Sequence, residues 1–594
     1  MPAPVLSRRD LEFLLYEWLD VTSLTARDRF REHSRETFDA LLDLSADMAM
    51  RHFAPHNRLS DTHEPVMRPD GTVQMIEDVT TALRLYFEAG LAATQFDERY
   101  GGLQAPSVIA RASMAWFQAA NASTSAYPLL TTANAATLIA HGTAEQVERW
   151  VPSMLEGRCL GTMCLSEPEA GSSLADITTR ATRQENGTYR LTGTKMWISG
   201  GDHDLAENIL HLVLAKIPGG GVGVRGISLF AVPKYLPDGT RNDITLVGLN
   251  HKMGMRGTTN TLLAFGDGGH PVGGRPGAVG YLVGEEHHGL THMFHMMNDA
   301  RIGIGFLATA IGYAGYLASL DYAKVRRQGR LPADKGTTAP PVALVEHADV
   351  RRMLLAQKSY VEGALALSLY CARLVDEQQT AVHQDGRERA ALLLDVLTPV
   401  AKSWPSQWCL EANDLAIQIH GGYGYARDSI VEQLYRDNRL NPIHEGTHGI
   451  QGLDLLGRKV RMHDGAGLEV LVSTISRTVQ RAERADADLA EFTTALRSAA
   501  ERLTDVTKTL WALGDVTVTL ANSSVYLEAA GHVVIAWMWL EQLLALGDRQ
   551  GEFYDGKRQA ARYFFRYELP KTSAQFDLLA RGDRTTLDTH PEWL

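Results

Sequence analysis

The sequence predicts an α+β fold in which helices and strands occupy separate blocks of the chain. Three observations support this class: helical periodicity near the N-terminus, a following run of short β-type segments, and long helical patterns in the remainder. Because the β-type segments do not alternate with helices, a βαβ arrangement is not expected. At 594 residues the chain is also too long for one ordinary domain.

The first block, residues 1–159, is predicted to be a helical domain. Apolar residues between Leu11 and Leu19 recur on one helical face, and Asp97–Gly102 has the composition of a turn between helices.

The second block, residues 160–285, is predicted to be an antiparallel β-domain that ends near Gly284. Short runs rich in β-branched and aromatic residues are bounded by Gly, Pro, Asn or Asp, which is typical of strands. The runs are Tyr189–Ser199, Ile209–Ile217, Gly226–Val232, Ile244–Val247 and Thr261–Phe265.

Residues 286–462 are predicted to form a helical bundle, and residues 463–594 an additional helical domain. In the bundle, an apolar stripe recurs every four or seven residues at Val350, Leu354, Val361, Leu365 and Leu369. The last domain is expected to be helical from Leu468 to Leu546 and to end in a polar tail. Pro218–Val224 and Gly329–Pro341 are predicted to be exposed loops.

Composition narrows the function classes. The hydrophobic and charged fractions, 45% and 22%, are those of a soluble globular protein. A net charge of −12 argues against a nucleic-acid or anionic-membrane partner. The four cysteines show no CxxC or zinc spacing and predict reduced thiols in a cytoplasmic protein. No signal-type run and no uninterrupted apolar stretch of about 20 residues, the length of a membrane span, is evident.

Three motifs resemble functional sites but lack the sequence context that those sites require. Gly221–Gly226 matches the dinucleotide pattern G-x-G-x-x-G, but a strand-like run follows it where a helix is required, so it is predicted to be a hairpin loop. His420-Gly421-Gly422 resembles an esterase oxyanion loop, but the chain has no G-x-S-x-G elbow. The histidines between His287 and His295 have a spacing that could bind a metal on a helix, but no clear acidic or cysteine partner completes a set, so no metal is expected.

The strongest signal is a set of five segments in a fixed order. They are Met163–Ser173, Lys195–Ser199, Asn298–Arg301, Tyr322–Gln328 and Gln418–Gln451. In the last of them Glu445 stands beside Gly446 and Thr447, downstream of a double glycine. Glycines let backbone approach a bulky anionic ligand, and the carboxylate is a candidate general base.

Together these segments resemble the acyl-CoA dehydrogenase family, over about Leu11 to Val460. The rest resembles the C-terminal helical extension of the long subgroup, which includes methylthiopropanoyl-CoA dehydrogenase-like enzymes. The resemblance implies an N-terminal helical domain, a middle β-domain, a helical bundle with the FAD and the catalytic base, and an extra helical domain.

The resemblance implies FAD-dependent α,β-dehydrogenation of an acyl-CoA to the 2-enoyl-CoA. Glu445 matches the base that removes the α-proton while a hydride leaves the β-carbon for flavin N5. Burial beneath a thioester would raise its pKa toward the value that catalysis needs. Some members carry the base directly before the arginine that matches Arg301, and this chain has Ala300 there.

Further site residues are implied by the same resemblance. The flavin contacts are Ser166, Trp197, Ser199, Arg326, Gln328, Gln418, Gly421, Gly422 and Thr447. The substrate contacts are Ser172, Arg301 and Gly446. Arg326 and Gln328 match residues that reach the flavin diphosphate of a neighbouring subunit. Without the resemblance, Trp197 would be ordinary sheet packing, and Arg326 and Arg301 would be solvated helix charges.

Three positions depart from the family pattern. Ser173 replaces an Asp, His444 replaces a Tyr before the base, and the segment from Arg326 to Gly329 is one residue short and lacks a Phe. The second departure changes the ceiling of the acyl pocket, so the substrate cannot be carried over. The third weakens the case for Gln328.

The resemblance also implies electron-transfer flavoprotein as acceptor and a homodimer. Members with the extension are commonly dimers, and an apolar face at Leu503, Val506, Leu510, Leu513 and Val516 is expected to pack against the chain's own helices. Two alternatives stay open: an acyl-CoA oxidase that uses oxygen, and a non-catalytic nucleic-acid-binding relative. Acidic residues between Glu483 and Glu491 argue against the second.

Overall fold

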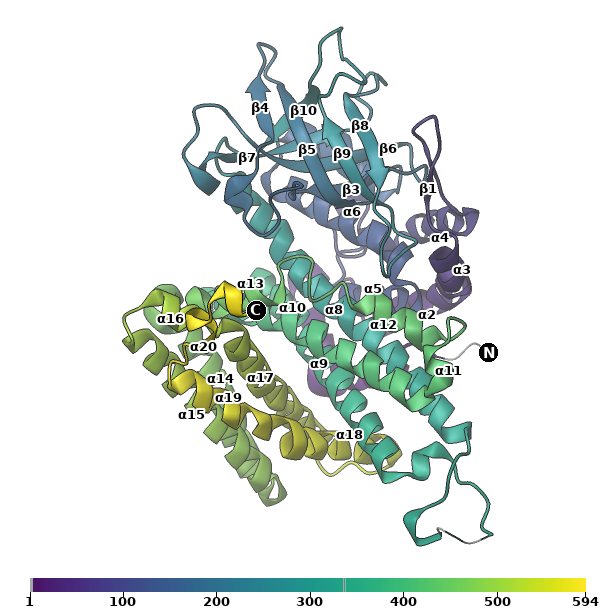
Figure 1. The fold of residues 1–594 in the computed structure, drawn as a ribbon, viewed down its shortest axis with the longest axis vertical. Helices are drawn as coiled ribbons and strands as arrows, with labels where there is room; N and C mark the ends of the chain where they lie inside the picture. The colour runs from purple at the N-terminus through teal and green to yellow at the C-terminus, as the bar shows by residue number, and fades with distance from the viewer. Residues whose placement is uncertain (1–3, 335, 337) are drawn as a thin grey trace. The chain divides into compact units, whose positions relative to one another are not determined.

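The computed structural model describes residues 4–334, 336 and 338–594 and divides into two compact units (Figure 1). Unit 1 comprises the chain up to Phe38, Pro106–Ala115 and Arg301–Leu594, and unit 2 comprises Asp39–Ala105 and Trp116–Ala300. The bounds of the four predicted domains stay a prediction.

The helices that precede the main sheet are α1 (Arg8–Glu12), α2 (Arg35–Met48), α3 (Asn57–Thr62), α4 (Glu77–Glu88), α5 (Ser107–Ala120), α6 (Ala122–His141) and α7 (Ala144–Leu155). Those that follow it are α8 (Gly289–Val325), α9 (Ala348–Thr380), α10 (Gln384–His420), α11 (Gly422–Tyr425), α12 (Ile430–Asn438), α13 (His448–Gly457), α14 (Met462–Ala485), α15 (Ala490–Ala512), α16 (Val516–Leu520), α17 (Ser523–Leu546), α18 (Glu552–Tyr563), α19 (Thr572–Ala580) and α20 (Thr585–Asp588).

The strands are β1 (Val66–Met67), β2 (Val73–Gln74), β3 (Cys159–Cys164), β4 (Arg180–Arg183), β5 (Tyr189–Ser199), β6 (Asn208–Lys216), β7 (Ile227–Pro233), β8 (Ile244–Leu249), β9 (Asn260–Phe265) and β10 (Ala278–Val283). All five predicted strands are present, and β5 has the predicted bounds. The segment Gly223–Gly226 is a short 3-10 turn between antiparallel β6 and β7, so the G-x-G-x-x-G motif lies in a hairpin loop, as predicted.

The main sheet has the order β10-β7-β6-β4-β5-β9-β8, with β3 paired to β6 and β10 also paired to β5. The prediction of an antiparallel domain is wrong at β6, because β3 and β4 both run parallel to it. The loop 165–179 returns the chain to the same end of the sheet between β3 and β4. The first of the five family-like segments, Met163–Ser173, begins at the end of β3 and continues into this loop.

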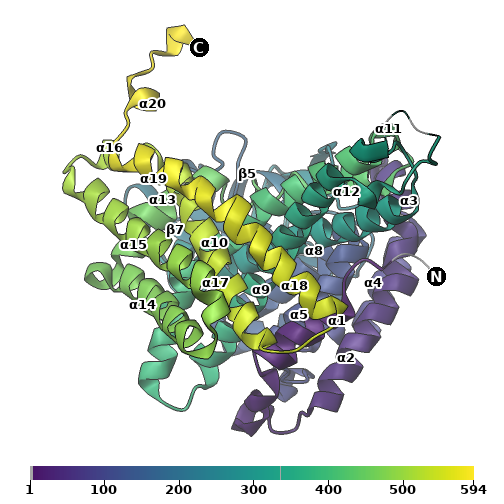
Figure 2. The same ribbon diagram turned by 90° about the horizontal axis from the view of Figure 1, so that it is seen from below.

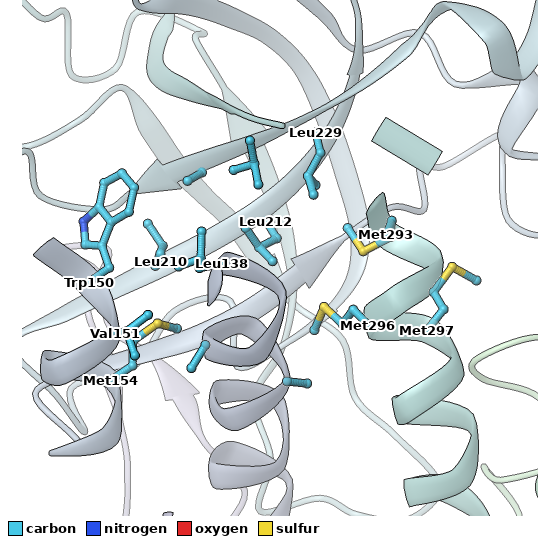
Figure 3. Packing of buried hydrophobic residues seen from close by; sticks show 14 of the residues in the cluster. Leu138, Trp150, Val151, Met154, Leu210, Leu212, Leu229, Met293, Met296 and Met297 are labelled. Carbon is cyan, nitrogen blue, oxygen red and sulfur yellow. The ribbon is translucent and has the colours of Figure 1, made fainter. Parts of the chain in front are cut away.

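The sheet is buried on both faces in unit 2. Along β6, Leu210, Leu212 and Leu214 lie in one apolar cluster, whereas Val213 and Ala215 lie in the other. Side chains alternate between the faces of a strand, so the nearly continuous apolar sequence of β6 serves two cores. Figure 3 shows the first cluster, in which side chains of α6 and α7 meet β6, β7 and three methionines at the start of α8.

Unit 1 is helical, and α14, α15, α17, α18 and α19 lie side by side (Figure 2). Four members of the predicted α9 stripe, Leu354 to Leu369, are buried. On α15, Leu503, Val506 and Leu510 are buried as expected. Leu513 and Val516 are 44% and 57% exposed, which contradicts the prediction, because α15 ends at Ala512 before the stripe reaches them.

The predicted polar tail is wrong as well. Beyond Leu546 the chain forms α18, α19 and α20, and Ala560, Ala561, Phe564 and Phe565 are buried there. An amphipathic helix contains many polar residues, so composition alone hides its apolar face.

A buried ion cluster joins this C-terminal region to the start of the chain. Lys557 of α18 contacts Asp10 of α1 and lies 3.0 Å from Glu362 Oε2 of α9. Tyr313 donates a hydrogen bond of 3.0 Å to Asp10 Oδ2. Such a cluster strongly disfavours removal of one member, because the remaining charges would be buried without compensation.

Two helices, α8 and α17, have the length and hydropathy of a membrane span. In the most apolar stretch of 18 residues in each helix, 89% of α8 and 83% of α17 is buried inside the protein, which is typical of core helices.

Candidate active site

The predicted base lies in a tight loop between α12 and α13 in unit 1. Glu445 has a φ of 52°, a left-handed conformation that is uncommon for a residue other than glycine. Gly446 follows with a φ of 87°, and a Cβ atom there would stand 2.5 Å from Gln451 Nε2. The backbone therefore requires glycine after the carboxylate and holds the glutamate in a strained conformation.

Two cations from other helices face the Glu445 carboxyl, which is partly buried. Burial raises the pKa of Glu445 to about 7, although Arg301 of α8 and Lys402 of α10 favour its ionised form. Arg301 is 4% exposed, and its Nη1 donates to Asp454 Oδ2 of α13 at 3.2 Å. The structure thus brings together Arg301, Glu445 and Gly446 of the predicted site.

Lys402 was not predicted. Its side chain is 0% exposed, and Nζ donates to the carbonyl oxygens of Asn441 at 2.8 Å and Gly446 at 2.7 Å. Burial lowers the pKa of Lys402 to about 7, opposed by Glu445 and reinforced by Arg301. The only signal in the sequence is a lysine among residues that the helical period of α10 buries.

A chain of buried asparagines, also missed from sequence, fixes the loop from the other side. Asn413 Oδ1 accepts from Asn438 Nδ2 at 2.7 Å, and Asn438 Oδ1 accepts from Asn441 Nδ2 at 2.8 Å. Asn441 Oδ1 lies 2.9 Å from Nε2 of His444. Burial lowers the pKa of His444 to about 3, so the ring is neutral and donates through Nε2 to this amide oxygen.

Helix α13 starts directly after the base, and its first turn holds the loop. The hydroxyl of Thr447, a predicted flavin contact, caps the helix by accepting from the Ile450 amide at 3.3 Å. Gln451 Nε2 donates to the Glu445 carbonyl at 3.1 Å. Ser403 Oγ lies 2.6 Å from His448 Nδ1, and His448 Nε2 lies 3.5 Å from Glu528 Oε1 of α17, so the extra C-terminal domain supports the same helix.

The residues predicted to hold the flavin diphosphate lie on an exposed part of unit 1. Arg326 follows the last residue of α8, 5.9 Å from the ring centre of Tyr423 in α11. Gly421 and Gly422 have no heavy atom within 4 Å of an added Cβ, so they border open space. Gln418 is exposed on α10, and Gln328 is exposed in a loop where its backbone pairs with Val342.

The remaining predicted flavin contacts lie in unit 2. Trp197 is 60% exposed and has a φ of 64°, at an irregularity where β5 changes register against β9. Ser199 Oγ accepts from Asn260 Nδ2 at 3.3 Å, and the Ser166 carbonyl accepts from the Met196 amide at 3.0 Å. The bulge therefore turns the indole of Trp197 outward instead of into the sheet core.

A buried ion pair locks the first two family-like segments together. Lys195 is 0% exposed, and its Nζ lies 2.9 Å from both Glu167 Oε1 and the Leu165 carbonyl. Glu167 also accepts from the amides and hydroxyls of Thr178 and Thr179. With five donors on the carboxylate, we take the pair as ionised, in line with a Glu167 pKa lowered to about 2 despite its burial.

Ser172 is exposed in the loop between β3 and β4. Among the described side chains, no group of three or more His, Cys, Asp or Glu is placed to hold a metal ion. The side chain of His295 lies outside the described part of the chain.

Comparison with known proteins identifies the family. Residues 36–158, 162–267 and 287–460 match the N-terminal, middle and C-terminal domains of acyl-CoA dehydrogenases, and residues 471–590 match an acetyl-CoA dehydrogenase C-terminal-like domain. The chain is 32% identical to a 3-methylmercaptopropionyl-CoA dehydrogenase of Ruegeria pomeroyi, over 96% of this chain and 97% of that protein.

Two further matches point to the same family. The chain is 32% identical to a broad-specificity linear acyl-CoA dehydrogenase of Mycobacterium tuberculosis, with 98% of each protein covered. An acyl-CoA dehydrogenase from Bacillus anthracis, solved with FAD, has the same fold, with a TM-score of 0.71 at 19% identity over 94% of this chain and 88% of that one.

The chain therefore belongs to the acyl-CoA dehydrogenase family, in the subgroup with a C-terminal extension. It is a FAD-dependent oxidoreductase that acts on the CH–CH bond of acyl-CoA thioesters, as the sequence predicted. Neither the oxidase nor the nucleic-acid-binding alternative gains support from these matches.

The residues present fit a flavin in each unit taken separately. In unit 2, an exposed tryptophan on a strained bulge offers a flat apolar surface to an aromatic ring. In unit 1, the open space at Gly421 and Gly422 and the nearby guanidinium of Arg326 suit a diphosphate.

Proposed function

We propose that Glu445 is the base that removes the α-proton of the acyl-CoA. The observation that carries this proposal is the loop itself, which holds a partly buried carboxylate in a left-handed conformation opposite two buried cations. FAD, when bound, supplies the acceptor for the hydride that leaves the β-carbon. Arg301 and Lys402 keep the carboxylate available in its basic form, against the effect of burial.

A base with a pKa near 7 suits catalysis at neutral pH. It is ionised often enough to accept a proton and basic enough to pull a weakly acidic α-proton. The Glu445 amide, next to the carboxylate, is the group that we propose to stabilise the developing enolate by donating to the thioester oxygen.

The test is Glu445→Gln, studied by anaerobic reduction of the bound flavin with an acyl-CoA. We expect unchanged FAD content and a reduction rate lowered by roughly 10²–10⁴-fold, because the amide cannot accept the proton. Asp299→Asn is the matched control, since Asp299 is a carboxylate beside Ala300 on α8. Near-normal reduction by E445Q, or loss of reduction in D299N alone, would remove Glu445 from the mechanism.

We further propose an unbranched acyl-CoA as the substrate. The two relatives described above are named for unbranched acyl groups, 3-methylmercaptopropionyl and linear acyl. A panel of linear, thioether-containing and α-branched acyl-CoAs tests this by flavin bleaching. Faster reduction by the branched members than by any linear one would overturn the proposal.

For the acceptor we propose electron-transfer flavoprotein. Turnover measured in parallel with that protein and with oxygen alone separates the two possibilities. Oxygen consumption at the full rate of turnover would make the chain an oxidase instead.

We also propose a cytoplasmic homodimer. In unit 1, Tyr423 and Tyr425 are 68% and 87% exposed, and Val325 beside Arg326 is 75% exposed, so the predicted diphosphate surface is apolar and uncovered in the single chain. Large exposed aromatic residues favour an interface. Light scattering that shows a monomer or a tetramer would contradict the dimer, and Arg326→Ala is expected to reduce FAD retention and dimer content together.

A further inference from the structure

Lys402 has an unusual position for a lysine. Its ammonium group is fully buried on α10, yet no carboxylate is hydrogen-bonded to it in the described structure. The two acceptors of Nζ, the Asn441 and Gly446 carbonyls, stand four residues before and one residue after Glu445. Lys402 therefore hydrogen-bonds the base loop on both sides of Glu445, the residue with the left-handed backbone.

We infer that Lys402 is a positioning residue for the base, fixing the left-handed Glu445–Gly446 turn and holding the ionised form of the carboxylate through its own charge. This inference rests on the proposed role of Glu445. It assigns to Lys402 two separable tasks, one geometric and one electrostatic.

The geometric task survives a change of protonation. A charged amine has three N–H donors and a neutral amine has two, and the loop uses two. Lys402 can therefore release a proton without losing either carbonyl. Since burial lowers its pKa to about 7, both forms are accessible in the range where Glu445 titrates.

The electrostatic task depends on every charge that faces the loop. Glu445 faces Arg301 and Lys402. Asp454 favours the charged form of Arg301, whereas Arg458 disfavours it. His444, the remaining titratable neighbour of Lys402, stays neutral because burial and Lys402 lower its pKa to about 3. Without Lys402, Arg301 is the cation of the described structure that still favours the ionised carboxylate against its burial.

The experiment compares Lys402→Met with wild type as FAD-loaded full-length enzyme. We expect the limiting rate of flavin reduction to fall by roughly 10–100-fold, because misplacement of a reacting group by about 1 Å can cost 10²-fold. We also expect the midpoint of the pH–rate profile to move upward, since the base loses a favourable charge. A purely structural lysine would change the rate or the stability without moving that midpoint.

Lys459→Met is the matched control. Lys459 is likewise a buried lysine of unit 1, 1% exposed, but its partner is Asp395 and Glu445 does not influence it. K459M is expected to lower the melting temperature and to leave the pH midpoint of reduction in place. If K402M does not fold, Lys402→Arg provides the second test, because a fixed guanidinium charge should lower the rate through altered geometry while the midpoint stays at or below that of wild type.

The outcomes separate the two proposals. An inactive E445Q together with a K402M enzyme of wild-type rate and midpoint would overturn the role of Lys402 and leave Glu445 as the base. An active E445Q would overturn Glu445 itself. An upward midpoint in K402M but not in K459M or K402R supports the inference. An equal shift in K402M and K459M would reduce Lys402 to a structural role.

Discussion

The base loop in unit 1 and the Trp197 bulge in unit 2 each hold a functional residue in a left-handed conformation, but the charges around the two residues differ. Each presents one functional residue in a left-handed conformation, Glu445 with a φ of 52° and Trp197 with a φ of 64°. Each is held by a lysine that is 0% exposed and that donates to backbone carbonyl oxygen. At the bulge the lysine also has a carboxylate partner, and at the base loop it does not.

This difference separates a permanent anchor from one that can titrate. Lys195 is paired with Glu167, whose pKa is lowered to about 2, and although burial lowers the pKa of Lys195, the carboxylate favours the charged form of the lysine. Lys402 has two neutral acceptors and a pKa lowered to about 7. A surface for a flat ring needs only rigidity, whereas a base benefits from a neighbour whose charge responds to its own.

The largest effect should follow from breaking the permanent anchor. Glu167→Ala leaves the Lys195 ammonium buried without its counter-charge, and we expect a loss of about 3–5 kcal/mol in unfolding free energy together with reduced FAD content. Denaturant unfolding and flavin absorbance measure these. The double variant K195M/E167L should recover part of the stability, and an E167A protein as stable as wild type would show that the pair is not an anchor.

Asn438→Leu tests whether the base loop depends on its asparagine chain as well as on Lys402. The substitution leaves Asn413 Oδ1 and the Asn441 amide without their partner inside the core, which should cost roughly 1–3 kcal/mol of stability for each such group. The rate of flavin reduction should fall as well. Asn242→Leu in unit 2 is the control, because Asn242 is also buried but donates to the Pro233 and Val279 carbonyls, outside the predicted site.

The pH dependence of the two regions should differ. Glu445 must be ionised to act, so the reduction rate should rise about tenfold per pH unit below a midpoint near 7 and level off above it. FAD affinity, which depends on the bulge, should stay constant across the same range. A flat rate profile, or FAD release near pH 7, would break the comparison.

The raised pKa of Glu445 also makes the stability of the folded chain depend on pH. The folded value, about 7, lies above the ordinary 4.5, so the folded chain binds more protons than the unfolded chain between these values. The contribution is fully present below pH 4.5 and is lost as the pH rises through 7. E445Q should therefore gain stability relative to wild type over that window, which thermal unfolding at several pH values can measure.

The smallest effect should come from the contact between the extra domain and the base helix. Glu528→Gln removes the charge 3.5 Å from His448 Nε2, and we expect a change of about 0.2–1 kcal/mol in stability and a small decrease in reduction rate. A stability equal to that of wild type would show that this contact contributes nothing measurable.

Sequence predicted the parts of this protein that have a local signature. The bounds of β5 follow from its β-branched and aromatic alternation, and the stripe of α9 follows from its period. Strands β3, β4 and β10 were missed because β4 is largely polar and the other two are short runs whose burial depends on distant partners. The polar tail was misread because α18 hides a narrow apolar face among charges.

The site divides in the same way. Glu445, Trp197 and Arg326 stand in motifs that a resemblance can transfer, and their roles are proposals supported by where the structure places them. Lys402, Lys195 and Asn438 carry no motif, since a buried lysine or asparagine is defined by contacts made across the fold. Only the tertiary structure reveals which polar residues of a helix are turned inward.

At position 445, the residue that best stabilises the fold and the residue that the reaction needs are different. Glycine would relieve the backbone, and any uncharged residue would relieve the burial of the carboxylate. A screen for thermostable variants should therefore enrich inactive chains at this codon. The glutamate persists only where turnover itself is under selection, which makes its presence a mark of a working enzyme.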